Sequence, residues 1–523
     1  MIEATEKKIR RGGRQARQAL RAAPLIEEMR PVKGGMESGK YKTLNDIDIQ
    51  KIHAAALDVL ANIGMADATA TCIKLVCDAG GSLTDQGRLL FPNSLIEDTL
   101  AIAGRNFVLH GQDPIHDMEP WGNKTYFGTA GAAISIIDAQ TGNYRDSTSY
   151  DLYDIARLVD KMDHIHFFQR SLVCRDMATP DDMDFHTTYA SIMGTSKHVG
   201  SSWVDPKHFQ KSLEMLHMLA GGEDKWRKRP FVSMSCCFVV PPLKFTEDAC
   251  NCLEAAVRGG MPVLLLAAGQ AGATSPASLA GAVVQEVAEV LAGLAYVNLI
   301  KPGHPAIFGT WPFVSDLRTG AMSGGSGEQA ILMSACAQMA KFYDLSGGVT
   351  AGMTDSKMPD MQAGIEVGYN HALVGNSGAN LIYESAGMHA SLLGFCMESV
   401  VIDNDSIGGV LRTMRGIEVN DDTLSIDVIR EAVMGPGHFL GSNQTLNVMQ
   451  SEYFYPTIGN RMSPKEWVEA GQPSIIDSAA KKVEEILTSH YPTHISDEMD
   501  KAIRERFNVK MPRQSMLPGN DRW

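Results

Sequence analysis

The 523-residue chain places several aromatic residues and a few charged ones in segments that follow short apolar runs. The aromatic candidates are Tyr126, Trp311, Phe313, Tyr383 and Phe395, and the charged or titratable candidates are Arg170, Glu384 and His389. The face of an aromatic ring attracts a cation by about 0.5 to 2 kcal/mol, most strongly when the cation is desolvated. Several rings with few carboxylates therefore indicate a binding site for a quaternary ammonium group. The alternative is that these rings fill a hydrophobic core, as most buried aromatic residues do.

The segment "TAGMTDSKMPDMQAG", residues 350–364, carries charge, sulfur and flexible backbone but almost nothing that would build a core. It contains Asp355, Lys357 and Asp360 among three methionines and two glycines. We expect this segment to line an opening in the protein. Lys357 also leaves a second chemistry open, because a suitably placed lysine forms a Schiff base with a carbonyl substrate.

Cys236 and Cys237 are adjacent and suggest a metal site. Neighbouring residues on a strand point to opposite faces, so at most one of the two thiols can enter a common site. A closed zinc site needs three or more protein ligands, and the sequence offers no companion cysteine or histidine at a suitable spacing. We therefore predict that the thiols pack as small apolar groups and that the chain binds no metal directly.

Short β-branched or aromatic runs alternate with longer segments of helical periodicity from residue 125 onward. The runs recur at intervals of about 30 to 45 residues, enough for one strand, one crossover helix and two loops. Near-continuous apolar strands that alternate with helices indicate a parallel sheet covered on both faces. Eight such units predict a closed (β/α)8 TIM barrel over residues 123–415, with an open doubly wound sheet as the alternative. The runs begin at residues 125, 166, 198, 231, 262, 305, 347 and 380.

A barrel would bring the candidate residues together, because active sites of β/α barrels lie in the loops after the carboxyl ends of the strands. Arg170 lies in the second run, Trp311 towards the end of the sixth and Glu384 towards the end of the eighth, and the Met-rich segment follows the seventh. His164 and His166 precede the second strand, so they would lie at the opposite end of the barrel. That position favours a structural role for these two histidines.

Composition excludes several classes of protein. A net charge of −14 argues against nucleic acid as the main partner, because phosphate binding needs a basic surface. The most apolar stretch, residues 261–300, is interrupted by Gln and Glu residues that a membrane span would not tolerate. Nine cysteines in so long a chain, without a secretory signal, are typical of reduced thiols. We therefore expect a soluble cytoplasmic protein.

Three further regions flank the predicted barrel. Residues 1–44 form a basic N-terminal arm that carries seven lysines and arginines between Lys7 and Arg21, and residues 45–122 show helical periodicity. Residues 416–523 form a helical C-terminal region with a tail. The arm and the tail are suited to clasp another subunit, so we expect a homo-oligomer. The alternative for the arm is a targeting or polyanion-binding segment.

Four stretches together resemble the trimethylamine methyltransferase family, which moves a methyl group from an amine to a corrinoid cofactor carried by a partner protein. They are "RRGGRQARQALR" from residue 10, "YFGTAGAA" from 126, "TDSKMPDMQAG" from 354 and "LIYESAGMHASLLGF" from 381. The likeness covers nearly the whole chain. No single stretch is specific for the family, but the four stretches together are. The name-giving members carry pyrrolysine near the stretch that corresponds to residues 350–364, where this chain has only standard residues. The chain is therefore similar to the branch without pyrrolysine, which resembles the glycine betaine:corrinoid protein methyltransferases.

The resemblance implies demethylation of a quaternary amine, glycine betaine first, with transfer of the methyl group to the Co(I) of a corrinoid (cobalamin) on a partner protein. A quaternary nitrogen leaves as a neutral tertiary amine, so the protein has only to hold the cation, align one N–CH3 bond and exclude water. Trimethylamine, carnitine and proline betaine stay open as substrates. Free cobalamin as the acceptor and a barrel that binds betaine or corrinoid without catalysis also stay open.

With this activity in view, we predict a role for each candidate residue. The five aromatic residues named first contribute to a cage for the cation. His389, with Arg170 as the weaker candidate, fixes the carboxylate of the substrate, and Glu384 balances charge or orients a neighbour. Gly352, Met353 and Asp355 lie where the corrinoid must enter.

Overall fold

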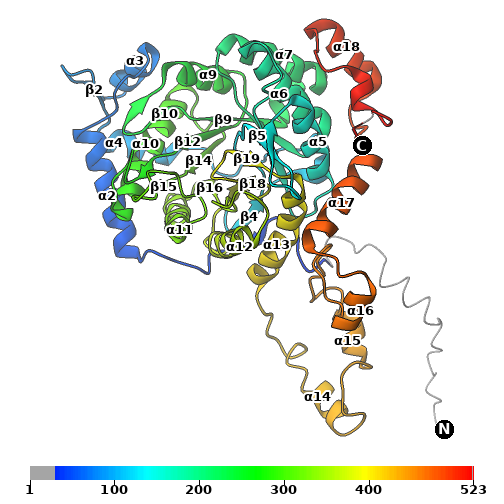
Figure 1. Cartoon of the computed structure of the whole chain (residues 1–523). Coiled ribbons are helices and arrows are strands. Elements are labelled where there is room, and N and C mark those ends of the chain that lie inside the picture. Colours follow the sequence, from blue (N-terminus) through cyan, green and yellow to red (C-terminus); the bar gives the residue numbers. More distant parts are fainter. Residues whose placement is uncertain (1–29, 521) are drawn as a thin grey trace, which may run out of the picture. The chain divides into compact units, whose positions relative to one another are not determined.

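The structure of the chain, a computed structural model, describes residues 30–520 and 522–523 (Figure 1). These residues group into two compact units. The barrel unit contains residues 34–415 and 456–523, and the arm unit contains residues 416–455 together with residues 30–33. The lysines and arginines of the predicted basic arm up to Arg21 lie outside the described residues.

Eight parallel strands form a closed barrel in the barrel unit (Figure 1). Each strand pairs with the next one along the chain, and the last pairs with the first. A parallel bridge between Gly128 and Phe167 joins the first two strands and completes the ring. The predicted (β/α)8 barrel is confirmed, and a closed ring excludes the open doubly wound sheet. The strands are β4 (Lys124–Phe127), β7 (Phe167–Gln169), β8 (His198–Ser201), β9 (Val232–Cys236), β12 (Val263–Ala267), β14 (Ala306–Thr310), β16 (Gly347–Thr350) and β17 (Leu381–Tyr383).

A helix follows each barrel strand and covers the outside of the ring. Side-chain caps fix where several of these helices begin: Thr148 accepts a hydrogen bond from the backbone of Asp151, and Asp360 accepts one from Ala363. The helices are α5 (Ser149–Asp160), α6 (Pro180–Gly194), α7 (Pro206–Ala220) with the short α8 (Glu223–Lys228), α9 (Glu247–Arg258), α10 (Leu279–Ile300), α11 (Gly327–Phe342), α12 (Met361–Gly375) and α13 (Met397–Arg415).

Helix α10 is largely apolar and is long enough to cross a membrane by length and composition alone, but 83% of its most apolar window is buried within the protein. The reason is its position. One side packs on β12 and β14, and the other is covered by α2 (Asp46–Asn62), α3 (Ala70–Asp78) and α4 (Asn93–Ile102). The helix therefore packs as the core helix of a soluble protein does, with the predicted N-terminal helices as its outer cover.

Short strands organise the loops at both ends of the barrel. At the carboxyl end, the loops after β4 and β17 combine into one four-stranded sheet, and the loops after β12 and β14 form a two-stranded one. These pairings hold the loops that follow four barrel strands in fixed positions. The short elements are β1 (Met36–Glu37), β2 (Ser82–Leu83), β3 (Leu89–Leu90), β5 (Ser135–Ile137), β6 (Tyr144–Asp146), β10 (Val239–Val240), β11 (Lys244–Phe245), β13 (Gln270–Ala271), β15 (Phe313–Val314), β18 (Met388–His389), β19 (Gly394–Phe395) and the 3-10 helix η2 (Pro114–His116).

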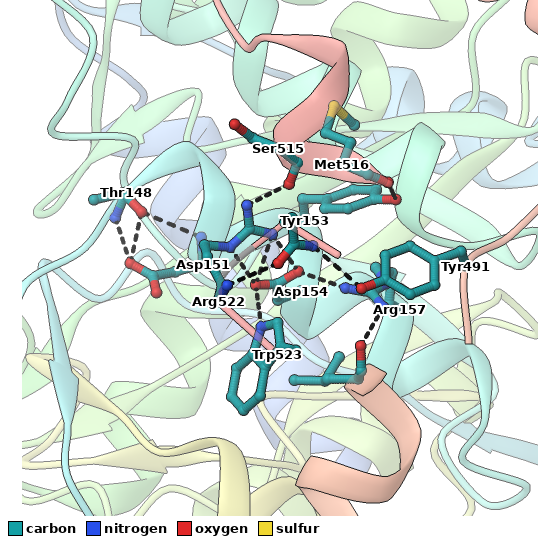
Figure 2. A network of polar contacts seen from close by, with 12 residues as sticks. Thr148, Asp151, Tyr153, Asp154, Arg157, Tyr491, Ser515, Met516, Arg522 and Trp523 are labelled. Atoms are coloured by element: carbon teal, nitrogen blue, oxygen red, sulfur yellow. Dashed lines mark hydrogen bonds and ion pairs between the residues drawn. The ribbon is translucent and has the colours of Figure 1, made fainter. Parts of the chain in front are cut away.

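The C-terminal end of the chain is anchored on α5 by a buried polar network (Figure 2). The Arg157 guanidinium is fully buried and donates to Asp154 Oδ1 at 2.8 Å and to the Leu487 carbonyl at 2.6 Å. Asp154 also accepts hydrogen bonds from Arg522 and from Trp523 Nε1 at 2.7 Å. Asp154 thus connects α5 with the end of the tail, and Arg157 connects α5 with α17 (Ile475–Ser489). The elements of this region are α16 (Pro464–Glu469), α17 (Ile475–Ser489), α18 (Asp497–Phe507) and η3 (Arg513–Met516).

The arm unit contains two short helices, α14 (Ile426–Val433) and α15 (Asn443–Val448). Between residues 416 and 455, Ala432 is the one buried residue. This segment therefore has almost no core of its own.

Candidate active site at the carboxyl end of the barrel

The inner wall of the barrel is polar at the carboxyl end of β9. Cys236 points outward, since its thiol donates to the Ala249 carbonyl of α9. The alternation along the strand therefore turns Ser235 and Cys237 inward. Ser235 is half-buried and Cys237 is exposed, although helices cover the outside of this strand.

Three aromatic rings form a continuous layer inside the barrel, opposite that polar wall. The ring of Tyr383 meets Phe167 edge-on at 4.9 Å between centroids and Trp311 at 5.3 Å. Glycine makes room for these rings: a Cβ at Gly128 would lie 2.3 Å from the Phe167 ring, and one at Gly348 would lie 3.1 Å from Tyr383. The indole Nε1 of Trp311 is buried and has no hydrogen-bond partner among the described residues.

Arg170, directly after β7, presents a guanidinium without a partner to this end of the barrel. The side chain is half-buried, and in the described part of the chain it makes neither a hydrogen bond nor an ion pair. Burial lowers its pKa, partly offset by the nearby thiol of Cys237 and the carboxyl of Asp184. The Asp184 carboxylate is occupied, because Oδ2 accepts from the Val204 backbone and lies 2.8 Å from His208 Nδ1. Arg170 is therefore free to bind an anionic group of a ligand.

Glu384, directly after β17, is a buried carboxyl group that no described residue stabilises. It is 1% exposed, and neither oxygen accepts a hydrogen bond within the described residues. Burial raises its pKa to about 8. Its backbone lies in the left-handed region, with φ of 55°, a conformation that costs a non-glycine residue of this kind about 1 kcal/mol or more. An unsatisfied buried acid requires an explanation, and a cationic ligand would supply the missing partner.

The thiol of Cys237 is near both Arg170 and Glu384. Burial raises its pKa, Arg170 lowers it and Glu384 raises it further. Both groups thus act on one inward-facing side chain. The carboxyl end of the barrel holds an unpaired cation on the β7 side and an unpaired acid on the β17 side.

The structure does not bring every predicted aromatic residue into this site. Tyr126 packs against His166, with 5.8 Å between ring centroids, and its hydroxyl accepts from the Glu119 backbone at 3.2 Å. Phe395 is fully buried in the four-stranded sheet, where it covers Gly387. Phe313 is buried in β15 and makes no ring contact in the described part of the chain. Of the predicted cage, only Trp311 and Tyr383 make a ring contact with each other in the described residues, because Phe313 and Phe395 lie in two different small sheets and Tyr126 packs on His166.

His389 is also set apart from the role predicted for it. Its Nε2 lies 2.7 Å from Ser399 Oγ, and the imidazole is buried. Burial lowers its pKa to about 4. The ring is uncharged at neutral pH and offers no positive charge to a carboxylate. Of the two predicted carboxylate ligands, the geometry favours Arg170.

The segment 350–364 is fixed by its own polar contacts. Gly352 has φ of 112°, and a Cβ there would lie 2.4 Å from His371 Nε2. Met353 is buried. The Asp355 carboxylate accepts from Ser323 Oγ at 2.7 Å and from the Gly324 backbone at 2.8 Å. These three predicted corrinoid contacts therefore hold the loop in place.

Lys357 is exposed, and its ammonium group donates to the carbonyl of Asp355. This position on the outer surface does not fit a Schiff-base lysine, which needs a desolvated pocket to lower its pKa. In the described residues, no three His, Cys, Asp or Glu side chains come together as a group that could hold a metal ion. His164 and His166 lie before β7, and His166 Nδ1 accepts from the Phe127 backbone at 2.9 Å.

Sequence reasoning missed two residues of the site. Phe167 lies two positions before Gln169 on one strand, and period-two alternation from Gln169 would have placed both in the barrel. Cys237 was interpreted as a buried apolar residue, yet it is exposed on the inner wall. Whether a side chain on the inner wall is exposed depends on how the other strands pack around it, which a local sequence pattern does not reveal.

A β/α barrel whose carboxyl end carries an aromatic layer, an unpaired guanidinium and an unsatisfied carboxyl group has the layout of a barrel enzyme, in which the active site lies at that end. Residues 10–514 match the family model described as trimethylamine methyltransferase (MTTB). The chain belongs to the trimethylamine methyltransferase family, and it is thus a methyltransferase of a corrinoid-dependent family. The predicted family is confirmed.

Relatives with different named substrates are about equally similar to the chain. It is 32% identical to trimethylamine methyltransferase MttB of Methanosarcina thermophila over 450 residues, which are 85% of this chain and 92% of that protein. It is 29% identical to the glycine betaine methyltransferase of Desulfitobacterium hafniense (strain Y51) over 467 residues, 88% and 95% of the two chains. The crystal structure of Methanosarcina barkeri monomethylamine methyltransferase (MtmB) is similar with a TM-score of 0.45 and 14% identity, covering 86% of this chain and 96% of that one.

Proposed function

We propose that the chain demethylates a quaternary amine that carries a carboxylate, with glycine betaine as the first candidate, and delivers the methyl group to the Co(I) of a corrinoid on a partner protein. The observation that carries this proposal is the unpaired Arg170 guanidinium at the carboxyl end of the barrel. A betaine is a zwitterion, and Arg170 offers its carboxylate a planar, always charged partner. Trimethylamine has no group that would use it.

The opposite charge of a betaine fits the other side of the site. The ring layer of Phe167, Tyr383 and Trp311 supplies aromatic surface for a methylated ammonium group. The buried carboxyl of Glu384 supplies a counter-charge once a cation is near enough to favour its ionised form. Two anchors of opposite sign would orient the substrate in one direction along the barrel end, which is what methyl transfer to a large partner requires.

The corrinoid supplies a strong nucleophile for the methyl group, so the chain has no need of a catalytic base. Gly352, Met353 and Asp355, which were predicted to contact the corrinoid, instead make contacts that hold the loop after β16 in place. Exposed residues of the same region are better placed to contact a corrinoid partner. Lys357 and Met361 are exposed beside that loop, and Met361 begins α12. We assign to these two side chains the contact with the corrinoid partner.

Trimethylamine is the second candidate substrate, and the sequence similarity to several trimethylamine methyltransferases favours it. Against it stand the standard residues at positions 350–364 and the unpaired charge of Arg170. Carnitine and proline betaine share the zwitterionic pattern and differ from glycine betaine in size. A barrel that binds betaine without transferring a methyl group would show binding but no product.

The test combines turnover and binding. The purified chain is incubated with reduced corrinoid protein, and separately with reduced free cobalamin, in the presence of glycine betaine, carnitine, proline betaine or trimethylamine. Dimethylglycine, measured by mass spectrometry, supports the proposal. Dimethylamine from trimethylamine as the main product would establish the second candidate, and tight betaine binding with no demethylated product would establish a binding module.

A further inference from the structure

A cavity of about 240 Å³ lies at the amino end of the barrel. Three of the residues that line it are prolines just before barrel strands: Pro230 precedes β9, Pro262 precedes β12 and Pro305 precedes β14. The active site of a β/α barrel lies at the carboxyl ends of the strands. This amino-end cavity is therefore separate from the candidate active site.

The charged side chains that line the amino-end cavity are basic. Arg227 and Lys228 come from the end of α8, and Lys301 directly follows α10. Among the described residues of the lining there is no Asp or Glu. The chain as a whole has a net charge of −14, so this wall is a local reversal of sign. A hollow with basic walls attracts anions and concentrates them.

Two acidic residues of this region already pair with basic side chains. Glu223 lies 2.8 Å from the guanidinium of Arg227. Asp117 lies 2.8 Å from that of Arg229 and 2.9 Å from His110 Nδ1. These carboxylates therefore have partners other than the two lysines of the cavity.

Lys228 and Lys301 are the cations that stay available. Both are exposed, and within the described part of the chain neither ammonium group forms an ion pair or a hydrogen bond. A phosphate group carries close to two negative charges at neutral pH and three strong acceptor oxygens. Two free ammonium groups beside a guanidinium match that charge.

His304 adds a second requirement for the ligand. The imidazole lines the cavity and is 1% exposed, and its Nε2 lies 2.9 Å from the Met261 carbonyl oxygen. A carbonyl only accepts, so Nε2 carries the proton. Burial, with a smaller contribution from Lys301, lowers the pKa of the ring to about 4. The ring is therefore neutral, and its Nδ1 is an acceptor.

That Nδ1 atom is buried and has no hydrogen-bond partner among the described residues. A buried acceptor without a donor is unfavourable. A hydroxyl group on a ligand would supply the missing donor. The ligand that fits both observations is an anion that also carries an O–H group.

We propose that the amino-end cavity binds a hydroxylated phosphate, which is either inorganic phosphate or a small phosphate ester with a free hydroxyl group. Lys228 and Lys301 bind the phosphate oxygens, and His304 accepts from the hydroxyl group. The volume corresponds to about eight water molecules, which leaves room for a short organic part beside Phe107. This inference does not depend on which amine the barrel demethylates.

The first test compares ligands. The full-length chain is titrated by calorimetry with inorganic phosphate, glycerol phosphate and sulfate at one ionic strength. Sulfate resembles phosphate in shape but has no hydrogen at neutral pH, so it should bind at least about tenfold more weakly than the better of the two phosphates. The tighter of the two phosphates identifies the source of the ligand. No binding of either phosphate, or equal affinity for sulfate, would overturn the proposal.

The second test locates the site with variants. Lys228→Met with Lys301→Met should weaken phosphate binding by about tenfold or more. The matched control, Lys161→Met with Lys207→Met, removes the same charge from two exposed lysines outside the lining and should keep the wild-type affinity. Equal losses for the two pairs would show only a general attraction of anions and would refute the site. Arg170→Met should also keep the affinity for phosphate; its loss in this variant would assign the anion to the carboxyl end of the barrel and refute the inference.

Discussion

Replacing Arg170 by methionine is the sharpest test of the proposed site. The substitution keeps an unbranched side chain of similar length and removes the guanidinium. In the described structure that guanidinium forms no ion pair, so its removal leaves no other charge uncompensated. The thermal stability of the variant should therefore equal or slightly exceed that of the wild type, because burying an unpaired charge is unfavourable.

The effect on substrate binding should be large and selective. A hydrogen-bonded contact to a charged group contributes about 1.5 to 3 kcal/mol, which corresponds to a roughly 10- to 150-fold increase in Kd for glycine betaine. Tetramethylammonium has the same cationic head and no carboxylate, so its Kd should change less than about twofold. Isothermal titration calorimetry of both ligands against both proteins measures this difference.

Arg175→Met provides the matched control. Arg175 lies five residues further along the chain and pairs on the surface with Asp146 at 2.5 Å. Its loss should leave both affinities unchanged. If Arg170→Met weakens betaine and tetramethylammonium by the same factor, the guanidinium does not bind the carboxylate and the assignment is wrong.

Three further predictions follow from buried groups. Burial raises the pKa of the Glu384 carboxyl group to about 8 in the folded protein, whereas its ordinary pKa is 4.5. Between these two values the folded protein keeps a proton that the unfolded chain has lost. The free energy of unfolding should therefore fall between about pH 5 and pH 8, by up to about 1.4 kcal/mol per pH unit from this group. Glu384→Gln should remove that contribution in thermal melts, and parallel wild-type and variant curves across this range would contradict it. Trp311→Leu should weaken tetramethylammonium binding by about 1 to 2 kcal/mol. The control is Trp203→Leu, which removes a buried indole that donates to Ser212 at 2.9 Å; this variant should be less stable but bind with unchanged affinity. Equal losses of affinity in the two variants would show that the effect is structural. Asp154→Ala should destabilise the barrel unit by about 3 kcal/mol in urea unfolding, because the buried Arg157 loses its counter-ion. Asp146→Ala, which breaks an exposed ion pair, should lower the free energy of unfolding by less than about 1 kcal/mol. Similar losses for the two variants would refute the role given to the buried network.

The sequence alone determined the architecture of the barrel. Each strand is a short apolar run that must be covered on both faces, and each helix carries its own periodicity and caps. Each of these signals lies within a short stretch of chain, so it can be recognised without knowing how the rest of the chain folds. The order of the strands around the ring also followed, because parallel strands joined by crossover helices pair with their neighbours in sequence. The family followed from motifs distributed over nearly the whole chain.

Sequence reasoning placed correctly those candidate residues whose position depends on strand order alone. Arg170, Trp311, Tyr383 and Glu384 directly follow or end barrel strands, and the structure places all four at the carboxyl end of the barrel. His389 and Phe395 come from the loop after β17, where the chain turns back into a small sheet. Their side chains pack there because the loops after β4 and β17 pair with each other, and no local pattern predicts that pairing.

Only the tertiary structure decided which charges are left without a partner. A buried arginine usually pairs with a carboxylate. The sequence does not show whether a particular carboxyl group pairs with that arginine or with another residue. Asp184 is occupied by Val204 and His208, so Arg170 is available. No residue in the described part of the chain donates a hydrogen bond to the buried carboxyl group of Glu384. The physical reason is general: satisfaction of a polar group is a property of all the elements packed around it, whereas the sequence pattern reports only on the element that carries it.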